Sequence, residues 1–260
     1  MVRFYNGEKE IEIATELEDL SPAQYLYFIA LSTVYADSRV MTENDYRVRW
    51  LSYLSGLGNV DFTLLTDDRK RYYLDAMHLT DGFFERRPDG RLFPSFDTAA
   101  NLLPEIEGYK GPGEWLEGMT FGEFTECVMT LGQISDMEGE EAYRAFGSVA
   151  RVMYRIPAEE PVPEILHFHA PTLFRNVMKR IESAPVNING EPIDFRIIFK
   201  SVGGKKKADD KTGWTGITFE VASSGIFGDL KGVENSDFWL VLLYLYRCKF
   251  EYINSKSPRK

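Results

Sequence analysis

Nine consecutive apolar residues from Phe238 to Tyr246 constrain the fold of this chain more than any other segment. They lie within a predicted helix from Asp237 to about Asn254, so apolar side chains surround its axis instead of forming one stripe. Such a helix belongs in the interior of a core or of an interface. Because the run is far shorter than the roughly 20 residues that cross a bilayer, we expect this helix to be the central element of the fold or of a subunit contact.

Capping signals predict most of the other helices. Ser21 with Gln24, and Thr120 with Glu123, have the spacing of a capping box, and Thr42 with Asp45 is a related helix start. Apolar periodicity extends these starts into helices and adds others. The expected helices span about 21–36, 42–54, 67–79, 120–131, 140–155, 172–183 and 213–223, besides the C-terminal helix.

Turn signals predict small β-hairpins between the helices. Asn6-Gly7 and Asn189-Gly190 favour the positive φ angles of tight hairpin turns, and Pro88-Asp89-Gly90 marks a third turn. The strongest of the three lies in 186–199, where β-branched residues follow the turn. The expected fold class is mainly α with small β-hairpins (α+β), a helical domain with inserted hairpins.

The hairpin at 186–199 also suggests where the chain divides. We expect a mainly helical domain over 1–183 and a second part over 184–260, packed on the first. That second part contains a hairpin, a mobile loop over 201–212 that has no apolar anchor, and the C-terminal helices. A single domain is the alternative, since 260 residues can form one core.

Charge is unevenly distributed along the chain. The net charge is −10, but residues 1–170 are strongly acidic whereas residues 171–260 are net basic. An acidic surface repels phosphate backbones, so no nucleic-acid partner is expected. The basic part either meets an acidic partner or faces the acidic part of the same chain. No membrane partner is expected either, because the apolar run is short and the acidic N-terminus lacks the pattern of a signal peptide.

Residues with catalytic or ligand chemistry are few. His167 and His169 form an H-x-H pair, but a structural zinc needs four ligands, and Cys127 and Cys248 lie far apart in the sequence. Cys248 lies in the apolar helix, so we expect a buried, inert thiol. The lysines near Lys211-Thr212 lack the glycine spacing of a phosphate loop. The sequence therefore predicts no catalytic, cofactor-binding or metal residue, and no cofactor.

Six segments carry a resemblance to a known family. They are LEDLSPAQYLY (17–27), RVRWLSYLSGL (47–57), WLEGMTFGEF (115–124), ARVMYRIPAEEPV (150–162), HFHAPTLF (167–174) and KTGWTGITFEVASSGIF (211–227). Together they resemble proteins encoded among the structural genes of tailed phages and prophages of Bacteroidetes, and elements of tail-assembly and neck proteins. The resemblance covers nearly the whole chain and brings no catalytic residue with it.

The resemblance implies a non-enzymatic tail or neck morphogenesis protein, either an assembly chaperone or a virion subunit. Its partners would be other phage tail or neck proteins, with a homo-oligomer left open, in the cytoplasm of the bacterial host or in the virion. The alternatives are a phage-encoded modulator of a host protein and a soluble enzyme with a dispersed carboxylate site. The residues expected on an interaction surface are Lys205, Lys206, Lys207, Lys211, Trp214 and Trp239.

Overall fold

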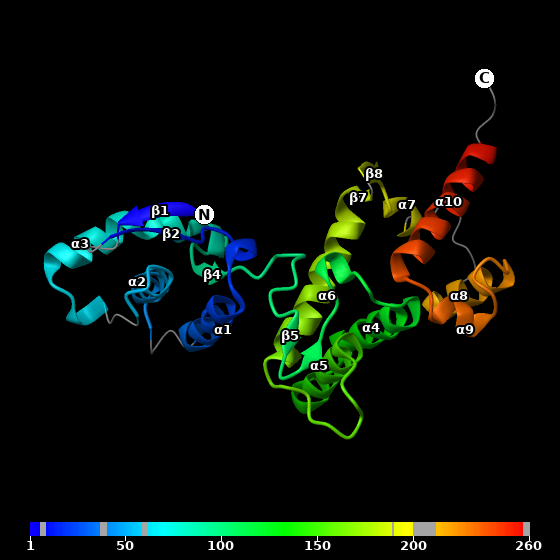
Figure 1. Ribbon diagram of the computed structural model, residues 1–260, viewed down its shortest axis with the longest axis horizontal. Helices are drawn as coiled ribbons and strands as arrows, with labels where there is room; N and C mark the ends of the chain where they lie inside the picture. The colour runs from blue at the N-terminus through cyan, green and yellow to red at the C-terminus, as the bar shows by residue number, and fades with distance from the viewer. Residues whose placement is uncertain (6–8, 37–40, 59–61, 189, 200–211, 257–260) are drawn as a thin grey trace. The chain divides into compact units, whose positions relative to one another are not determined.

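The computed structural model describes residues 1–5, 9–36, 41–58, 62–188, 190–199 and 212–256. Within these residues the protein is mainly α-helical, with small antiparallel sheets of two strands each (Figure 1), which confirms the expected fold class. The chain divides into two compact units, Met1–Thr98 and Ala99–Lys260, each with its own buried hydrophobic residues. The loop expected over 201–212 lies outside the described residues, apart from Thr212.

The division falls after Thr98, not after Ser183 as the sequence analysis expected. Residues on both sides of position 183 share one core, because Phe124 and Phe174 of the earlier segment pack with Phe238 of the later one. The hairpin and loop that suggested a boundary are therefore insertions within a unit. The true division lies in the irregular stretch between about 80 and 119, where no composition change marks it.

In its described residues, the first unit combines three α-helices with two hairpins. Its helices are α1 (Pro22–Ala36), α2 (Glu43–Leu54) and α3 (Asp67–Ala76), and its strands are β1 (Val2–Tyr5), β2 (Glu10–Ile13), β3 (Phe84–Arg86) and β4 (Leu92–Pro94). Short 3₁₀ helices span Leu17–Asp19, Phe62–Leu64 and Met77–Phe83. Both expected hairpins form, with Val2 opposite Ile13 and Phe84 opposite Pro94.

The predicted caps fix the starts of α1 and α2. The Ser21 hydroxyl accepts from the Gln24 amide at 3.3 Å, while the Gln24 side chain accepts from the Ser21 amide at 2.9 Å. Thr42 accepts from the Asp45 amide at 3.2 Å. These side chains satisfy amides that have no partner within the first helical turn.

An aromatic cluster forms the core of the first unit. The fully buried ring of Phe28 lies 4.8 Å from Trp50, 5.7 Å from Phe83 and 6.2 Å from Tyr46, measured between ring centroids. These residues come from α1, from α2 and from the 3₁₀ helix that precedes β3. The cluster therefore joins the helices of the unit to its second hairpin.

The second unit contains the larger helical assembly. Its helices are α4 (Phe121–Gln133), α5 (Gly139–Tyr154), α6 (Leu166–Ser183), α7 (Arg196–Phe199), α8 (Gly213–Ser223), α9 (Leu230–Glu234) and α10 (Phe238–Lys256). Its strands are β5 (Glu105–Ile106), β6 (Tyr109–Lys110), β7 (Val186–Ile188) and β8 (Glu191–Ile193), and 3₁₀ helices span Glu114–Leu116 and Ile134–Asp136. Helices α4, α5 and α6 pack against one another, and the predicted capping box of Thr120 and Glu123 starts α4.

Two segments of the second unit differ from the prediction. The hairpin at 186–199 ends at Ile193, and the apolar residues after it form the short helix α7, because Asp194 accepts a hydrogen bond from the Arg196 amide at 3.1 Å. Helix α6 begins at Leu166 instead of Thr172, and Pro171 lies inside it. Pro171 is the sixth residue of that helix, so its missing N–H removes the one backbone hydrogen bond that this position would donate to the carbonyl of His167.

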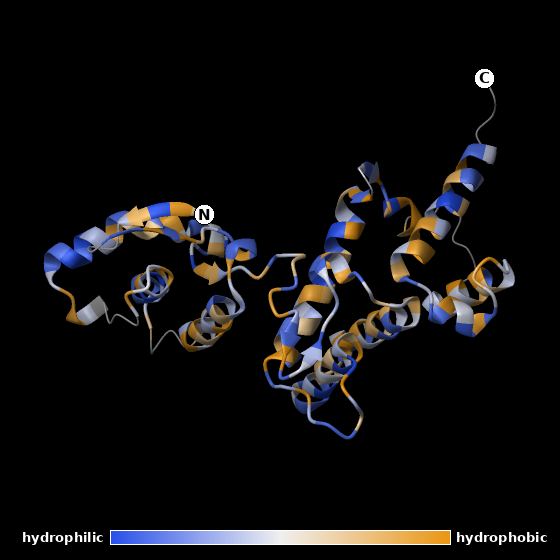
Figure 2. Cartoon of the chain, viewed as in Figure 1, coloured by the Kyte–Doolittle hydropathy of each residue, from blue (hydrophilic) through white to orange (hydrophobic). Residues whose placement is uncertain are grey.

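Helix α10 is anchored at its start and exposed toward its end. The Phe238 amide donates to the Met119 carbonyl at 3.1 Å, and Phe238, Val241 and Leu242 are fully buried. Leu240, however, is 57% exposed, and most of the described side chains from position 247 onward are exposed. Figure 2 shows this change from a hydrophobic start to a mixed end. The core of this chain therefore covers only one side of the first turns of α10, and the helix is not enclosed by the fold. A central place in a subunit contact stays a prediction.

Candidate functional site

Of the six residues expected on an interaction surface, only the two tryptophans fall in the described part of the chain. Lys205, Lys206, Lys207 and Lys211 lie outside it. The half-buried Trp214 ring packs edge-on against Phe124, at 5.1 Å between centroids, and against Phe121 at 6.1 Å. This contact attaches α8 to α4.

Trp239 has a similar place at the base of α10. Its Nε1–H donates to the carbonyl of Trp115 at 3.0 Å, and its ring lies 5.7 Å from that of the buried Phe195. Both tryptophans thus join elements within the second unit, and the structure does not bring them together on one exposed surface.

His167 and His169 point in different directions from the first turns of α6. The His169 ring is buried, and its Nε2 lies 2.9 Å from Oδ1 of Asn101. The His167 ring stacks on Tyr143 of α5 at 4.0 Å, next to Gly147, where a Cβ atom would come within 2.7 Å of the imidazole. The described residues hold no group of three or more His, Cys, Asp or Glu side chains arranged for a metal ion.

Asn101 is the centre of a buried polar network that the sequence analysis did not anticipate. Its Nδ2 donates to the Pro112 carbonyl at 2.7 Å, and its Oδ1 accepts from the Leu103 amide at 3.0 Å. The Tyr154 hydroxyl donates to the Leu103 carbonyl at 2.7 Å. The network attaches the irregular segment around residues 101–112 to α5 and α6. Burial lowers the pKa of His169 to about 4 and raises that of Tyr154, so both groups stay neutral at physiological pH.

The two cysteines differ in accessibility. Cys127 on α4 is buried, and burial raises the pKa of its thiol. Cys248 on α10 is exposed, so the expectation of a buried thiol at that position is wrong. The second half of α10 is exposed. The apolar run does not predict this exposure, because the run ends at Tyr246, before Cys248.

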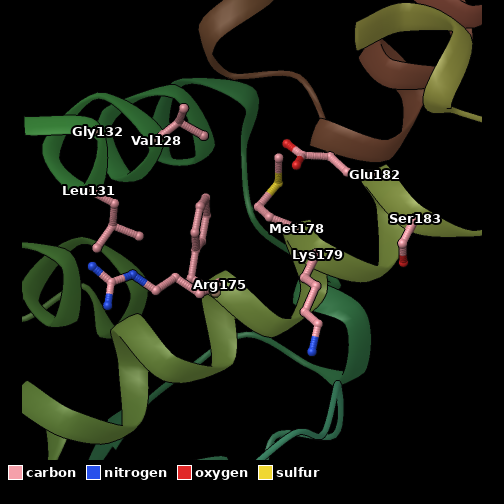
Figure 3. Close-up of a pocket in the computed structure, with 9 residues that line it drawn as sticks. Val128, Leu131, Gly132, Arg175, Met178, Lys179, Glu182 and Ser183 are labelled. Carbon is pink, nitrogen blue, oxygen red and sulfur yellow. The ribbon is translucent and has the colours of Figure 1, made fainter. Parts of the chain in front are cut away.

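A groove of about 560 Å³ lies between α4 and α6 (Figure 3). Figure 3 shows Val128 and Leu131 coming from α4, and Arg175, Met178 and Lys179 from α6. The full lining consists of an apolar set with charged residues along α6: Val128, Leu131, Gly132, Phe174, Arg175, Met178, Lys179, Glu182 and Ser183. We call this feature the α4–α6 groove.

The α4–α6 groove combines apolar surface with two cations and the carboxylate of Glu182. Phe174 is almost fully buried beneath it, while Val128, Leu131 and Met178 are partly exposed and offer apolar surface. Arg175 and Lys179 lie one helical turn apart on α6. The Arg175 guanidinium lies 5.4 Å from the centre of the Phe146 ring of α5.

A second surface is the stripe of Tyr246, Lys249, Phe250 and Ile253 on α10, which we call the α10 stripe. These residues follow the spacing i, i+3, i+4, i+7, which places them on one side of the helix. Tyr246 packs against Phe195 at 6.0 Å and stacks on Phe250 at 5.9 Å. Phe250 is 49% exposed. The stripe therefore begins in the packed part of the second unit and includes the half-exposed ring of Phe250.

Comparisons with known proteins find no relative of this chain. No protein-family model, no curated protein and no solved structure matches the chain. Among the described helices, none is both long and apolar enough to cross a membrane.

Proposed function

We propose that this chain is a non-enzymatic morphogenesis protein of a tailed phage or prophage, and that it acts through protein–protein surfaces during tail or neck assembly. It works as an assembly chaperone or as a virion subunit, in the cytoplasm of the bacterial host or in the particle. The sequence resemblance described above supports the phage setting. The observation that carries an interaction role is the α10 stripe, whose aromatic side chains continue beyond the core.

Exposure of the α10 stripe has a free-energy cost that a partner would remove. Fully burying a large apolar side chain stabilises a protein by roughly 1.5–3 kcal/mol. Contiguous exposed apolar residues with polar neighbours are typical of interaction sites. Anchors at i, i+3, i+4 and i+7 are the pattern by which an amphipathic helix enters a groove on its partner. Phe250, which is 49% exposed, and the half-buried Ile253 are the anchors in the later turns of the helix.

The α4–α6 groove offers a second contact of different character. Its apolar floor and the cations Arg175 and Lys179 would take an acidic segment of another tail or neck protein. A protein with one groove and one projecting helical stripe can hold two partners at once, as an assembly factor or a connecting subunit must.

The test is affinity purification from a host that produces the particles. A tagged wild-type chain is compared with the double variant Phe250→Asp, Ile253→Asp. The control is Arg247→Ala, Glu251→Ala, which removes a solvent-exposed ion pair of 2.9 Å on another side of the same helix. We expect tail or neck proteins to co-purify with the wild type and the control but not with the Asp variant.

Two outcomes would contradict this proposal. Recovery of a single host protein, with no tail or neck protein, would favour a modulator of that host protein. Equal recovery of tail proteins with the Asp variant would show that the α10 stripe is not the contact. If the stripe is confirmed, the copy number of the chain in purified virions then separates a subunit from a chaperone.

A further inference from the structure

The β3–β4 hairpin of the first unit presents two arginines directly opposite each other. Its strand ladder ends with Arg86 opposite Leu92. The Arg87 amide then donates to the Arg91 carbonyl at 2.9 Å, so these two residues form the next pair. Opposite side chains of an antiparallel pair have Cβ atoms about 4.5–5.5 Å apart. Both arginine side chains are exposed, so the hairpin places two guanidinium groups side by side in solvent.

The turn between the two arginines has a fixed backbone. Pro88 occupies the second position of the turn, and the Gly90 amide donates to the Arg87 carbonyl at 2.9 Å. Gly90 has a φ of 83°, a left-handed conformation that glycine adopts without strain. Asp89 Oδ1 accepts from the Arg91 amide at 3.0 Å. The spacing of the two arginines is therefore set before any ligand binds.

The Arg87 side chain is oriented by an aromatic ring. Its guanidinium lies over the Phe93 ring, 3.5 Å from the ring centre. Stacking of this kind holds the plane of the guanidinium and leaves the N–H groups at its edge available for a bidentate contact. Arg87 forms no ion pair with any carboxylate in the described part of the chain.

The repulsion between the two arginines is only weakly compensated. Like charges directly opposite each other on neighbouring strands are destabilising. Arg91 lies 3.9 Å from Asp89, with side chains that are 77% and 56% exposed, and such a pair contributes little. Arg86 pairs with Glu43 at 3.3 Å, and strand alternation places it on the other face of the hairpin. An anion bound by both arginines would remove the repulsion and add charge-assisted hydrogen bonds.

We propose that the face of the hairpin formed by Arg87, Arg91 and Phe93, which we call the arginine face, binds a carboxylate-rich, extended segment of a partner protein. The planar fork of each guanidinium matches the two oxygens of a carboxylate. The half-buried Phe93 ring adds apolar surface next to the charges. The arginine face lies in the first unit, so this site is additional to the α10 stripe and to the α4–α6 groove of the second unit.

The neighbouring carboxylates favour a peptide over a nucleic acid. Glu85 lies opposite Phe93 on the same face of the hairpin, and Asp89 lies in the turn. The closely spaced phosphates of a nucleic-acid backbone would meet these carboxylates as well as the arginines, on a chain whose net charge is −10. An extended peptide brings alternate side chains to one face about 6.5 Å apart. It can therefore place acidic residues on the arginines and neutral residues beside Glu85.

Charge reversal tests the arginine face. Fluorescence anisotropy on the full chain measures binding of a fluorescein-labelled peptide of four Glu-Ser repeats. The site variant is Arg87→Glu, Arg91→Glu. The matched control, Arg69→Glu, Arg71→Glu, makes the same charge change at exposed positions of α3 in the same unit. The variant Arg87→Lys, Arg91→Lys keeps the charge and removes the planar forks. Circular dichroism and thermal unfolding report whether each variant is folded.

We expect the wild type and the control to bind the peptide, more tightly at low salt. The site variant should bind it at least roughly tenfold more weakly, because like charges would then face each other. The lysine variant should have an intermediate affinity, since a lysine contacts a carboxylate as a point charge. If the charge reversal unfolds the first unit, Arg87→Gln, Arg91→Gln replaces it, again with weaker binding expected.

A wild type that does not bind the peptide at low salt would overturn the inference. Equal losses in the site variant and the control would do the same, because they would assign binding to the overall charge. Tighter binding of a labelled single-stranded DNA of twelve thymidines, lost in the site variant, would assign the arginine face to nucleic acid instead. None of these results bears on the α10 stripe, which lies in the other unit and is tested by different variants.

Discussion

His169 Nε2 lies 2.9 Å from Asn101 Oδ1 in the interior of the second unit. The same oxygen accepts the Leu103 amide, and the Asn101 Nδ2 donates to the Pro112 carbonyl, so the orientation of the amide is set by its neighbours. The Nε2 of the neutral imidazole must therefore carry the proton and donate it to Oδ1. A buried, neutral histidine links α6 to the irregular segment that precedes α4.

This histidine should make stability depend on pH. Burial lowers the pKa of His169 to about 4, below its ordinary value of about 6.5. As the pH falls from 6.5 towards 4, the unfolded chain binds a proton that the folded chain does not, so the free energy of unfolding falls. We expect His169 to account for a loss of about 2 kcal/mol between pH 7 and pH 5.

Urea unfolding of the wild type and of His169→Gln at both pH values measures this loss. Carboxylates elsewhere titrate equally in the two proteins, so the difference between them isolates the histidine. Parallel pH dependence of the two proteins would mean that His169 is accessible to protons in the folded state.

Removing the anchor of α10 should destabilise the second unit. Phe238 is fully buried and packs against Phe124 and Trp239. Phe238→Ala should cost about 3–5 kcal/mol, because it leaves a cavity in the core. Leu240→Ala, two residues further on at a side chain that is 57% exposed, should change the free energy by no more than about 0.5 kcal/mol. Chemical denaturation compares the two, and equal effects would contradict the described orientation of the helix.

One thiol should react rapidly in the folded protein. Cys248 is exposed, whereas Cys127 is buried with a raised pKa, and the thiolate is the reactive form. A chromogenic disulfide reagent should therefore detect one fast thiol per native chain and two after denaturation. Cys248→Ser should remove the fast phase. Two fast thiols in the native protein would show that α4 opens readily.

A glycine at the α4–α6 groove gives a stability test with an internal control. A Cβ atom at Gly132 would meet no atom within 4 Å, so Gly132→Ala should stabilise α4 by roughly 0.5–1 kcal/mol through its higher helix propensity. Gly122 lies in the same helix, but a Cβ there would come within 3.1 Å of the Glu234 carbonyl oxygen. Gly122→Ala should therefore give no gain. Thermal unfolding measures both, and a gain at Gly122 alone would contradict the packing of α9 on α4.

The sequence by itself predicts the local structure well. Ser21, Thr42 and Thr120 cap the helices at which they were expected, and the hairpins form where turn residues favour them. These features depend on residues three or four positions apart, whose hydrogen bonds form whatever the rest of the chain does. The fold class follows from them.

Only the tertiary structure decides which sides of these helices are covered. The α4–α6 groove joins residues of two helices about 45 positions apart in the chain, and the Asn101 network joins an irregular segment to α6. The apolar run of α10 predicts burial, but Leu240 and Cys248 are exposed because the core reaches only one side of that helix. The division after Thr98 likewise reflects which segments share a core. Burial depends on contacts between residues that are distant in the sequence, so the apolar periodicity of one segment does not determine which of its side chains are buried.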